Sequence, residues 1–197
     1  MTKIDNNVIS EDDFASGGSG GGNGFTSPWS LSGDASVVTS GGAYHDAYHL
    51  RLRRSNGRAE RGVDLSGASD TRLAFWAKLN DFESGDTAAV RVSPDGINWT
   101  TLHTFTSGES VNAYQYFEFD LSSFPMTNDF RFAFEADMSN SRDYFYVDNI
   151  RFSGQFGPPN LAPTAVAGGP GSGTEDIAVN FDASGSTDPE GDPLTYS

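Results

Sequence analysis

The chain has 197 residues, of which 36% are hydrophobic, 13% are aromatic and 20% are charged. The aromatic content excludes an intrinsically disordered chain, and the length suffices for a hydrophobic core without disulfides. The formal net charge of −15 excludes general binding to nucleic-acid phosphates and disfavours anionic membrane surfaces. The absence of cysteine excludes thiolate chemistry, and no apolar run is long enough for a membrane-spanning helix.

The central part of the chain alternates apolar and polar residues in short segments separated by turn residues. In the first segment Leu73, Phe75 and Ala77 alternate with a second set that also carries bulk, so both faces of this strand are expected to be covered. Segments of this length and spacing predict an all-β fold, a β-sandwich or jelly roll, with little helix. The expected strands are residues 71–78, 87–92, 99–105, 114–121, 129–135 and 144–152.

A linker rich in proline and glycine is predicted late in the chain. Residues 154–163 contain three prolines and two glycines, which disfavour both helix and central strand. The segment that follows is acidic and has no basic residue. We therefore expect a jelly-roll β-sandwich at residues 8–154, a linker at 155–162 and a separate domain at 163–197.

The segment after the linker resembles the first half of a polycystic kidney disease (PKD) domain. The resemblance is carried by Asn-Leu-Ala-Pro-Thr at 160–164 and by Asp-Ala-Ser-Gly-Ser-Thr-Asp-Pro-Glu-Gly-Asp at 182–192. PKD domains are immunoglobulin-like sandwiches of about twice this length. The resemblance implies a partial PKD-like sandwich, and hence a chain that belongs to a larger parent protein.

The preceding segment resembles jelly-roll modules of secreted bacterial hydrolases, which are similar to the MAM domain and to several families of carbohydrate-binding module. The motifs that carry the resemblance are Asp-Asp-Phe at 12–14, Leu-Ala-Phe-Trp at 73–76, Ser-Pro-Asp-Gly-Ile-Asn-Trp at 93–99 and Tyr-Phe-Tyr-Val-Asp-Asn-Ile at 144–150. The resemblance implies a non-catalytic accessory module of a secreted bacterial protein, located outside the cell or at its surface.

The same resemblance implies a structural calcium ion that ties the N-terminal strand to the last strand. Calcium takes six to eight hard oxygen ligands, which suits a chain rich in carboxylates. Asp13, Asp46 and Asp148 are the candidate ligands. The alternative for Asp148 is pairing with an arginine or capping of a turn.

A carbohydrate site needs exposed aromatic rings beside polar side chains, because the C–H faces of sugars stack on aromatic rings. Trp76 is expected in the core because it lies in mid-strand between apolar residues. Trp29 is expected to pack near the N-terminal strand, and Trp99 to belong to a structural turn. The candidate ligand-binding residues are Tyr44, His49, Arg51, Arg53, Tyr114, Tyr116 and Tyr144.

Half of the twelve basic residues fall within a short stretch and are all arginine, whose planar fork fits carboxylate and sulfate groups. This cluster is compatible with an acidic polysaccharide as partner. Internal pairing with the excess of acidic residues is the favoured alternative. The members are Arg51, Arg53, Arg54, Arg58, Arg61 and Arg72.

We expect no enzymatic activity. His45 and His49 share an expected strand with Asp46 beside them, but no third zinc ligand follows at a recognisable spacing. No nucleophile elbow or His-Glu-x-x-His motif is present. The predicted function is polysaccharide binding by a calcium-stabilised module, and the alternative is a calcium-stabilised adhesion or spacer module that makes protein–protein contacts. A binding module should carry an aromatic row or pocket on one sheet, whereas a spacer should have its two ends at opposite ends of the sandwich.

Overall fold

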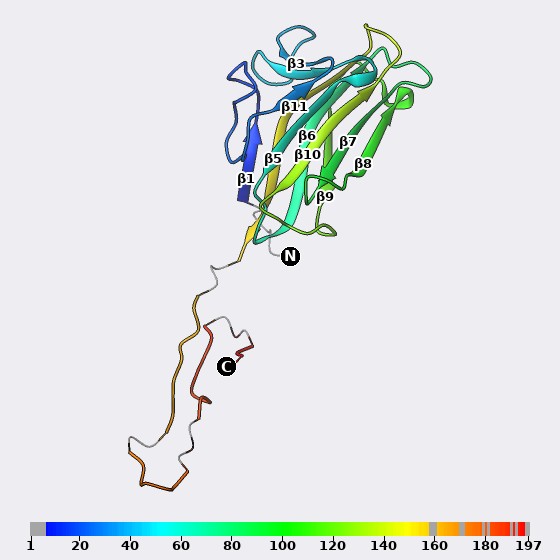
Figure 1. The fold of residues 1–197 in the computed structure, drawn as a ribbon. Helices are drawn as coiled ribbons and strands as arrows, with labels where there is room; N and C mark the ends of the chain where they lie inside the picture. The colour runs from blue at the N-terminus through cyan, green and yellow to red at the C-terminus, as the bar shows by residue number, and fades with distance from the viewer. Residues whose placement is uncertain are drawn as a thin grey trace, which may run out of the picture. The chain divides into compact units, whose positions relative to one another are not determined.

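The computed structural model describes residues 7–157 and, in the C-terminal segment, residues 161–169, 172–178, 180, 182–189, 191 and 193–195. The chain divides into two units, Met1–Gly157 and Pro158–Ser197. No helix in the described part of the chain is long and apolar enough to span a membrane. The regular secondary structure of the first unit is almost entirely β-strand (Figure 1), as the sequence predicts.

Two antiparallel sheets form a jelly-roll β-sandwich, with one sheet of six strands and one of five. The six-stranded sheet runs in the order β3 (Ala35–Val38), β4 (His49–Leu52), β11 (Tyr144–Phe156), β6 (Ala68–Asn80) and β9 (Gln115–Asp120), with β1 (Asn7–Asp12) also paired to β11. The five-stranded sheet runs in the order β2 (Ser30–Ser32), β5 (Arg58–Val63), β10 (Phe130–Asp137), β7 (Thr87–Ser93) and β8 (Thr100–Thr106). Helix is limited, in the described residues, to single 3-10 turns at Arg54–Asn56 and Ser107–Glu109.

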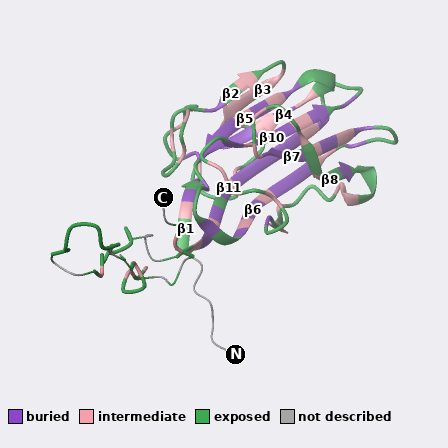
Figure 2. Cartoon of the chain, turned by 60° about the horizontal axis from the view of Figure 1, so that its bottom comes forward, coloured by how far each residue is buried: buried purple, intermediate pink, exposed green. Residues whose placement is uncertain are grey.

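The core lies between the two sheets and is built mainly from phenylalanine rings. Alternate residues of each strand point inward, so buried positions run along β6, β7, β10 and β11 (Figure 2). The Phe75 ring of one sheet meets the Phe134 ring of the other edge-to-face, with 5.0 Å between centroids, and Phe132 meets Phe152 at 5.0 Å. Each such pair contributes about 0.5–1.5 kcal/mol beyond the burial of its area.

Strand β11 shares one edge between two partners. Its first part pairs with β4 through Phe145↔Leu52 to Val147↔Leu50, and its last part pairs with β1 up to Asn7↔Gly154. The pairing with β6 on the other edge shifts register between Asp148 and Arg151, where Asn149 adopts a left-handed φ of 47°. Residues 148 and 149 therefore lie between the part of β11 that pairs with β4 and the part that pairs with β1. The loop of residues 39–48 and the segment of residues 13–23 lie next to these two residues.

The prediction for residues 114–121 is confirmed. In β9 the rings of Phe117 and Phe119 pack against the core, and Tyr116 and Glu118 face outward. In the C-terminal segment the described residues contain isolated bridges, Thr164↔Thr187 and Gly168↔Asp182, and no extended strand. The domain boundaries and the PKD-like half therefore stay predictions.

Candidate functional site

The loop of residues 39–48, between β3 and β4, lies on the outer face of the six-stranded sheet. Lys78 on β6 donates from its Nζ to the carbonyl oxygens of Gly41 and Gly42, at 2.5 and 3.2 Å. The loop covers the outer face of β6 around Lys78, which is buried, but Arg72 near the other end of the segment is 40% exposed. The prediction that both faces of residues 71–78 are covered is therefore confirmed only at the Lys78 end.

Asp148 on β11 binds the backbone in the middle of this loop. Its Oδ2 accepts hydrogen bonds from the backbone N–H groups of Tyr44 (2.8 Å) and His45 (3.0 Å), and its Oδ1 accepts one from Asn149 N (2.8 Å). The carboxyl group is fully buried, and this burial raises its pKa to about 6 against the opposing effect of the three N–H groups. Asp148 therefore caps a turn of the loop, which was the alternative to its metal role.

His49, at the start of β4, lies under the same loop and is fully buried. Its Nε2 lies 2.8 Å from the carbonyl oxygen of Ser40, which can only accept, so Nε2 carries the proton. Its Nδ1 then accepts from the hydroxyl of Tyr114. Burial lowers the pKa of His49 and raises that of Tyr114, so both groups are neutral at pH 7.

Four aromatic residues gather around the loop. Tyr44 stacks on Trp76 with 4.0 Å between ring centroids and an interplanar angle of 13°. Tyr114 meets Tyr44 at 5.7 Å, and Tyr116 meets Trp76 at 5.5 Å from the neighbouring strand. Tyr44 and Tyr116 are the exposed members, at 42% and 52%. Trp76 is half-buried on the outer face, so its predicted place in the core is wrong: the alternation that sends Phe75 inward sends Trp76 outward.

A pocket of about 590 Å³ opens beside these rings. Its floor is the outer face of β11, β6 and β9, where Ala74 leaves room between larger side chains. One wall is formed by residues 13–23, which follow β1, and another by His45 of the loop. The lining residues are Glu11, Asp12, Asp13, Ala15, Ser16, Gly22, Asn23, His45, Ala74, Trp76, Tyr116, Asn149, Ile150 and Arg151.

Arg151 brings a cation to this pocket. It is exposed on β11 between Ala74 of β6 and Glu11 of β1, and among the described residues no carboxylate forms a close ion pair with it. The hydroxyl of Tyr116 is turned to Glu118 and donates to its Oε2 at 2.8 Å. Burial and this carboxylate raise the pKa of Tyr116 to about 12, so the hydroxyl remains protonated at neutral pH.

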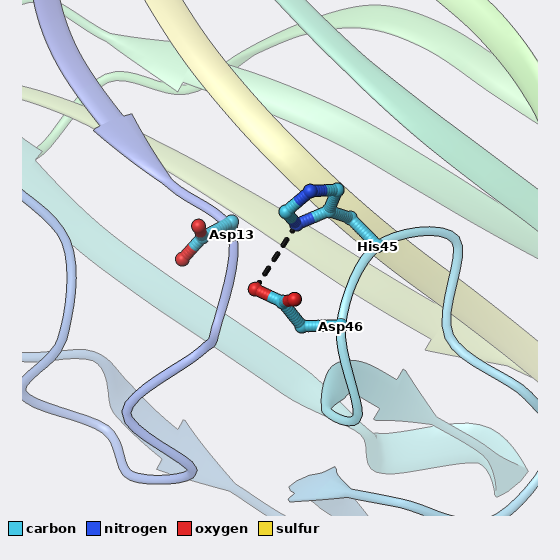
Figure 3. Close-up of side chains that lie close together, drawn as sticks. All are labelled: Asp13, His45 and Asp46. Carbon is cyan, nitrogen blue, oxygen red and sulfur yellow. Dashed lines mark ion pairs between the residues drawn. The ribbon is translucent and has the colours of Figure 1, made fainter.

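Asp13, His45 and Asp46 lie close together at the edge of the pocket (Figure 3). Their ligand atoms lie within 4.8 Å of one another, and His45 Nδ1 is 3.1 Å from Asp46 Oδ2. Two of the three predicted calcium ligands are thus brought together, while Asp148 is bound to backbone N–H groups and is not in this group. The two carboxylates fit the oxygen chemistry of calcium, and the imidazole does not.

The predicted ligand residues are divided by the structure. Tyr116 lines the pocket, and Tyr44 stacks on Trp76 beside it. His49 is buried beneath the loop and cannot reach a ligand in the pocket. His45 lies in the loop, so the expectation that it shares a strand with His49 is wrong. Residues outside the pocket lining are Arg51, which donates to Ser36; Arg53, which pairs with Asp34; Tyr114, which donates to His49; and Tyr144, which stacks on Tyr146 at 5.5 Å.

The arginine cluster is largely neutralised internally, in agreement with the favoured alternative. Arg61 is buried and pairs with Asp12 at 2.5 Å, and Arg54 joins Asp34 at 3.4 Å. The remaining pairs are Arg58 with Glu60 and Glu135, and Arg72 with Glu118 and Asp120. Sequence analysis missed Arg151, Trp76 and Asn149 as pocket residues, although the Leu-Ala-Phe-Trp alternation was sufficient to place Trp76 opposite Phe75.

No protein-family model and no curated protein matches the sequence. Solved structures share the fold. The CBM22-1 xylan-binding domain of Paenibacillus barcinonensis Xyn10C is 11% identical, with a TM-score of 0.52, over 78% of this chain and 97% of that domain. The C-terminal family 22 carbohydrate-binding module of Clostridium thermocellum Xyn10B is 18% identical, with a TM-score of 0.51, over 76% and 96%. The K2 cleaved adhesin domain of Lys-gingipain is 19% identical, with a TM-score of 0.50, over 72% and 97%. The chain has the β-sandwich fold of carbohydrate-binding modules.

Proposed function

We propose that this chain is a non-catalytic carbohydrate-binding module whose ligand is a polysaccharide, and that the pocket beside Trp76 and Tyr116 is its binding site. The observation that carries the proposal is the pair of aromatic rings on the outer face of the sheet, with centroids 5.5 Å apart, at an open pocket that an arginine also lines. Rings in such a position offer apolar faces to the C–H groups of a sugar. Arg151 and Asn149 supply donors for its hydroxyl or carboxylate groups.

Two features favour this function over a spacer. The first is the pocket itself, because a spacer needs no aromatic pocket on a sheet. The second is the pairing Asn7↔Gly154, which puts the chain's entry into the sandwich beside its exit. A module that links its neighbours end to end would have the two at opposite ends.

The proposal extends to the setting of the module. Its resemblance to accessory modules of bacterial hydrolases supports secretion and attachment to a longer parent chain. The formal charge of −15 disfavours nucleic acid as partner. Acidic polysaccharides remain within the proposal because Arg151 can pair with a carboxylate or sulfate group.

The test begins with a glycan-array and polysaccharide pull-down screen, with and without calcium. For a polysaccharide that binds, Trp76→Ala and Tyr116→Ala should each weaken binding by about tenfold or more, since each removes roughly 1.5–3 kcal/mol of apolar contact. Trp99→Ala is the matched control, because Trp99 lies in the hairpin between β7 and β8, where its ring covers Arg58 at 4.5 Å. Binding that is equal in all three variants would contradict the site, and a blank screen would contradict the function.

The proposal includes a structural calcium ion held by Asp13 and Asp46. The two carboxylates come from different segments, one after β1 and one in the loop of residues 39–48, so an ion between them would join these segments. It would also relieve the repulsion of two neighbouring anions in an acidic protein. Two points support this part of the proposal. The modules that the sequence resembles often hold a structural calcium ion, and the two carboxylates lie close together.

Removal of calcium is expected to destabilise the protein. An ion present at a hundredfold excess over its Kd contributes about 2.7 kcal/mol, and in a chain of this size each kcal/mol corresponds to roughly 2–4 °C in Tm. Chelation by EDTA should therefore lower Tm in calorimetry, and Asp13→Ala/Asp46→Ala should abolish the difference. Asp137→Ala, which removes an exposed carboxylate at the end of β10, is the control and should keep it. An unchanged Tm on chelation would remove calcium from the proposal.

A further inference from the structure

We infer that the pocket binds the end of a glycan chain and not its interior. The inference rests on the proposed carbohydrate function and specifies its ligand. An extended polysaccharide that is bound along its length needs two openings on opposite sides of the site. The pocket is instead walled on two adjacent sides.

The first wall is the loop of residues 39–48, which is fixed to the sheet at residues 41–45. Lys78 holds the carbonyl groups of Gly41 and Gly42, Asp148 holds two N–H groups farther on, and the Tyr44 ring lies on Trp76. These contacts come from two strands, β6 and β11. The loop is therefore held firmly on the outer face of the sheet. A sugar chain cannot pass across β4 and the first half of β11 without displacing it.

The second wall is the segment of residues 13–23, along the β1 side. Its start is fixed by Phe14, which is fully buried, and its end by the bridge Glu11↔Asn23. Between them Arg61 donates to the carbonyl oxygen of Gly21 at 2.6 Å. Asp13, Ala15, Ser16 and Gly22 of this segment line the pocket, so a chain that crosses the sheet from β9 toward β1 meets them and stops.

The open side is that of β9, the edge strand of the sheet. Tyr116 is half exposed there, and β9 has no further strand beside it among the described residues. Next to Trp76 the pocket floor is formed by Ala74, whose small side chain makes the pocket deep enough for a sugar ring. A sugar chain can thus lie over Tyr116 with its terminal residue at the inner corner.

The inner corner carries groups that suit a chain terminus. A terminal sugar has one hydroxyl group more than an internal sugar of the same chain, and His45 and Asp13 stand where that group would lie. The pocket volume of about 590 Å³ is within the range of sites for small ligands, roughly 300–1,000 Å³, and is enough for a short oligosaccharide. A site for a chain interior would instead extend across the whole sheet.

The test uses the polysaccharide identified by the screen and its oligosaccharide ladder from the disaccharide to the hexasaccharide, measured by calorimetry. Affinity should reach its full value at the disaccharide or trisaccharide. Endo-cleavage of the polymer at constant mass should raise the number of binding sites in proportion to the new chain ends. Affinity that rises through the hexasaccharide, or site numbers that ignore cleavage, would overturn the inference and leave the proposed function standing. A polysaccharide screen without any binding would overturn both.

A variant that lifts the first wall adds an independent test. At Gly41 an added Cβ would lie 2.6 Å from Cζ of Tyr146, so Gly41→Ala should displace the loop. Gly42→Ala is the matched control, since Gly42 also has positive φ but no atom within 4 Å of an added Cβ. In Gly41→Ala the longer oligosaccharides should gain affinity over the trisaccharide, and in Gly42→Ala they should not. A length profile that is flat in both, with Gly41→Ala folded and its loop cleaved faster by protease, would show that the loop is not the barrier and would overturn the inference.

Discussion

Arg61 is a cation built into the interior of the sandwich. Its guanidinium group is almost fully buried and donates to Asp12 Oδ2 (2.5 Å), Ser27 O (2.8 Å) and Gly21 O (2.6 Å). Burial lowers its pKa against the effect of Asp12, yet from so high a starting value that the group stays charged. One side chain thus ties β5 to the segment that forms the second wall of the pocket.

Arg61→Met is expected to destabilise the protein by about 3–5 kcal/mol, because it leaves Asp12 buried without its counter-charge. Asp12 also accepts from Trp29 Nε1 and Phe14 N, so the damage should reach the N-terminal loop. Chemical denaturation measures the change in free energy of unfolding. Arg58→Met, which removes a half-buried arginine from surface ion pairs, is the control and should cost less than about 1 kcal/mol. An equal loss of unfolding free energy in the two variants would show that burial does not make the Arg61–Asp12 pair more important than a surface ion pair.

At the scale of single residues, sequence reasoning found the groups whose type alone is informative. It named Asp13, Asp46 and Tyr116, which the structure places at or beside the pocket. It did not find Arg151, because a single arginine within a strand gives no sign of lining a pocket. That property depends on which segments the fold brings near, and no local pattern contains it.

Among the elements, β11 has the most to do with the site. It pairs with β6 along one edge, and the bulge at Asn149 divides its other edge between β4 and β1. The bulge re-aims the strand so that Asn149, Ile150 and Arg151 all line the pocket. The positive φ of Asn149 is a conformation that asparagine and glycine adopt with little strain.

Asn149→Val should lower the free energy of unfolding by about 1–3 kcal/mol, since a β-branched residue is strained at a φ of 47°. Asn149→Gly keeps the conformation accessible and should be nearly as stable as the parent chain. Thermal unfolding monitored by circular dichroism compares the three proteins. If valine and glycine have the same effect, backbone conformation at the bulge does not matter, and the side-chain contacts of Asn149 would explain the loss.

The last six strands, β6 to β11, were predictable because alternation and turn residues are local signals, whereas no range was predicted for β1 to β5. The expected segments 87–92 and 129–135 agree with β7 and β10 to within a residue or two. The loop of residues 39–48 was not predictable. Its path depends on Lys78 and Asp148, which are far away in the sequence, and local reading extended a strand across His45 instead.

For the whole molecule, the charge of −15 and the arginine cluster have a common explanation. The outer face of the five-stranded sheet carries a lattice of ion pairs in which Glu60 meets both Arg58 and Arg131. Most of the cluster is used to neutralise part of the acidic excess within the fold. Composition predicted this pairing, but only the topology could show which carboxylate each arginine meets.

The pairing of Asn7 with Gly154 also has a mechanical consequence, because the two ends of the sandwich lie side by side. If the chain is pulled at both ends of the sandwich, the load falls on the last hydrogen bonds between β1 and β11 and separates the two strands from that end, bond by bond. Strands loaded in this way open like a zipper, at much lower force than strands sheared along their length. Peeling β1 away would draw out the segment that follows it, so tension applied at these two points would dismantle the second wall of the pocket first.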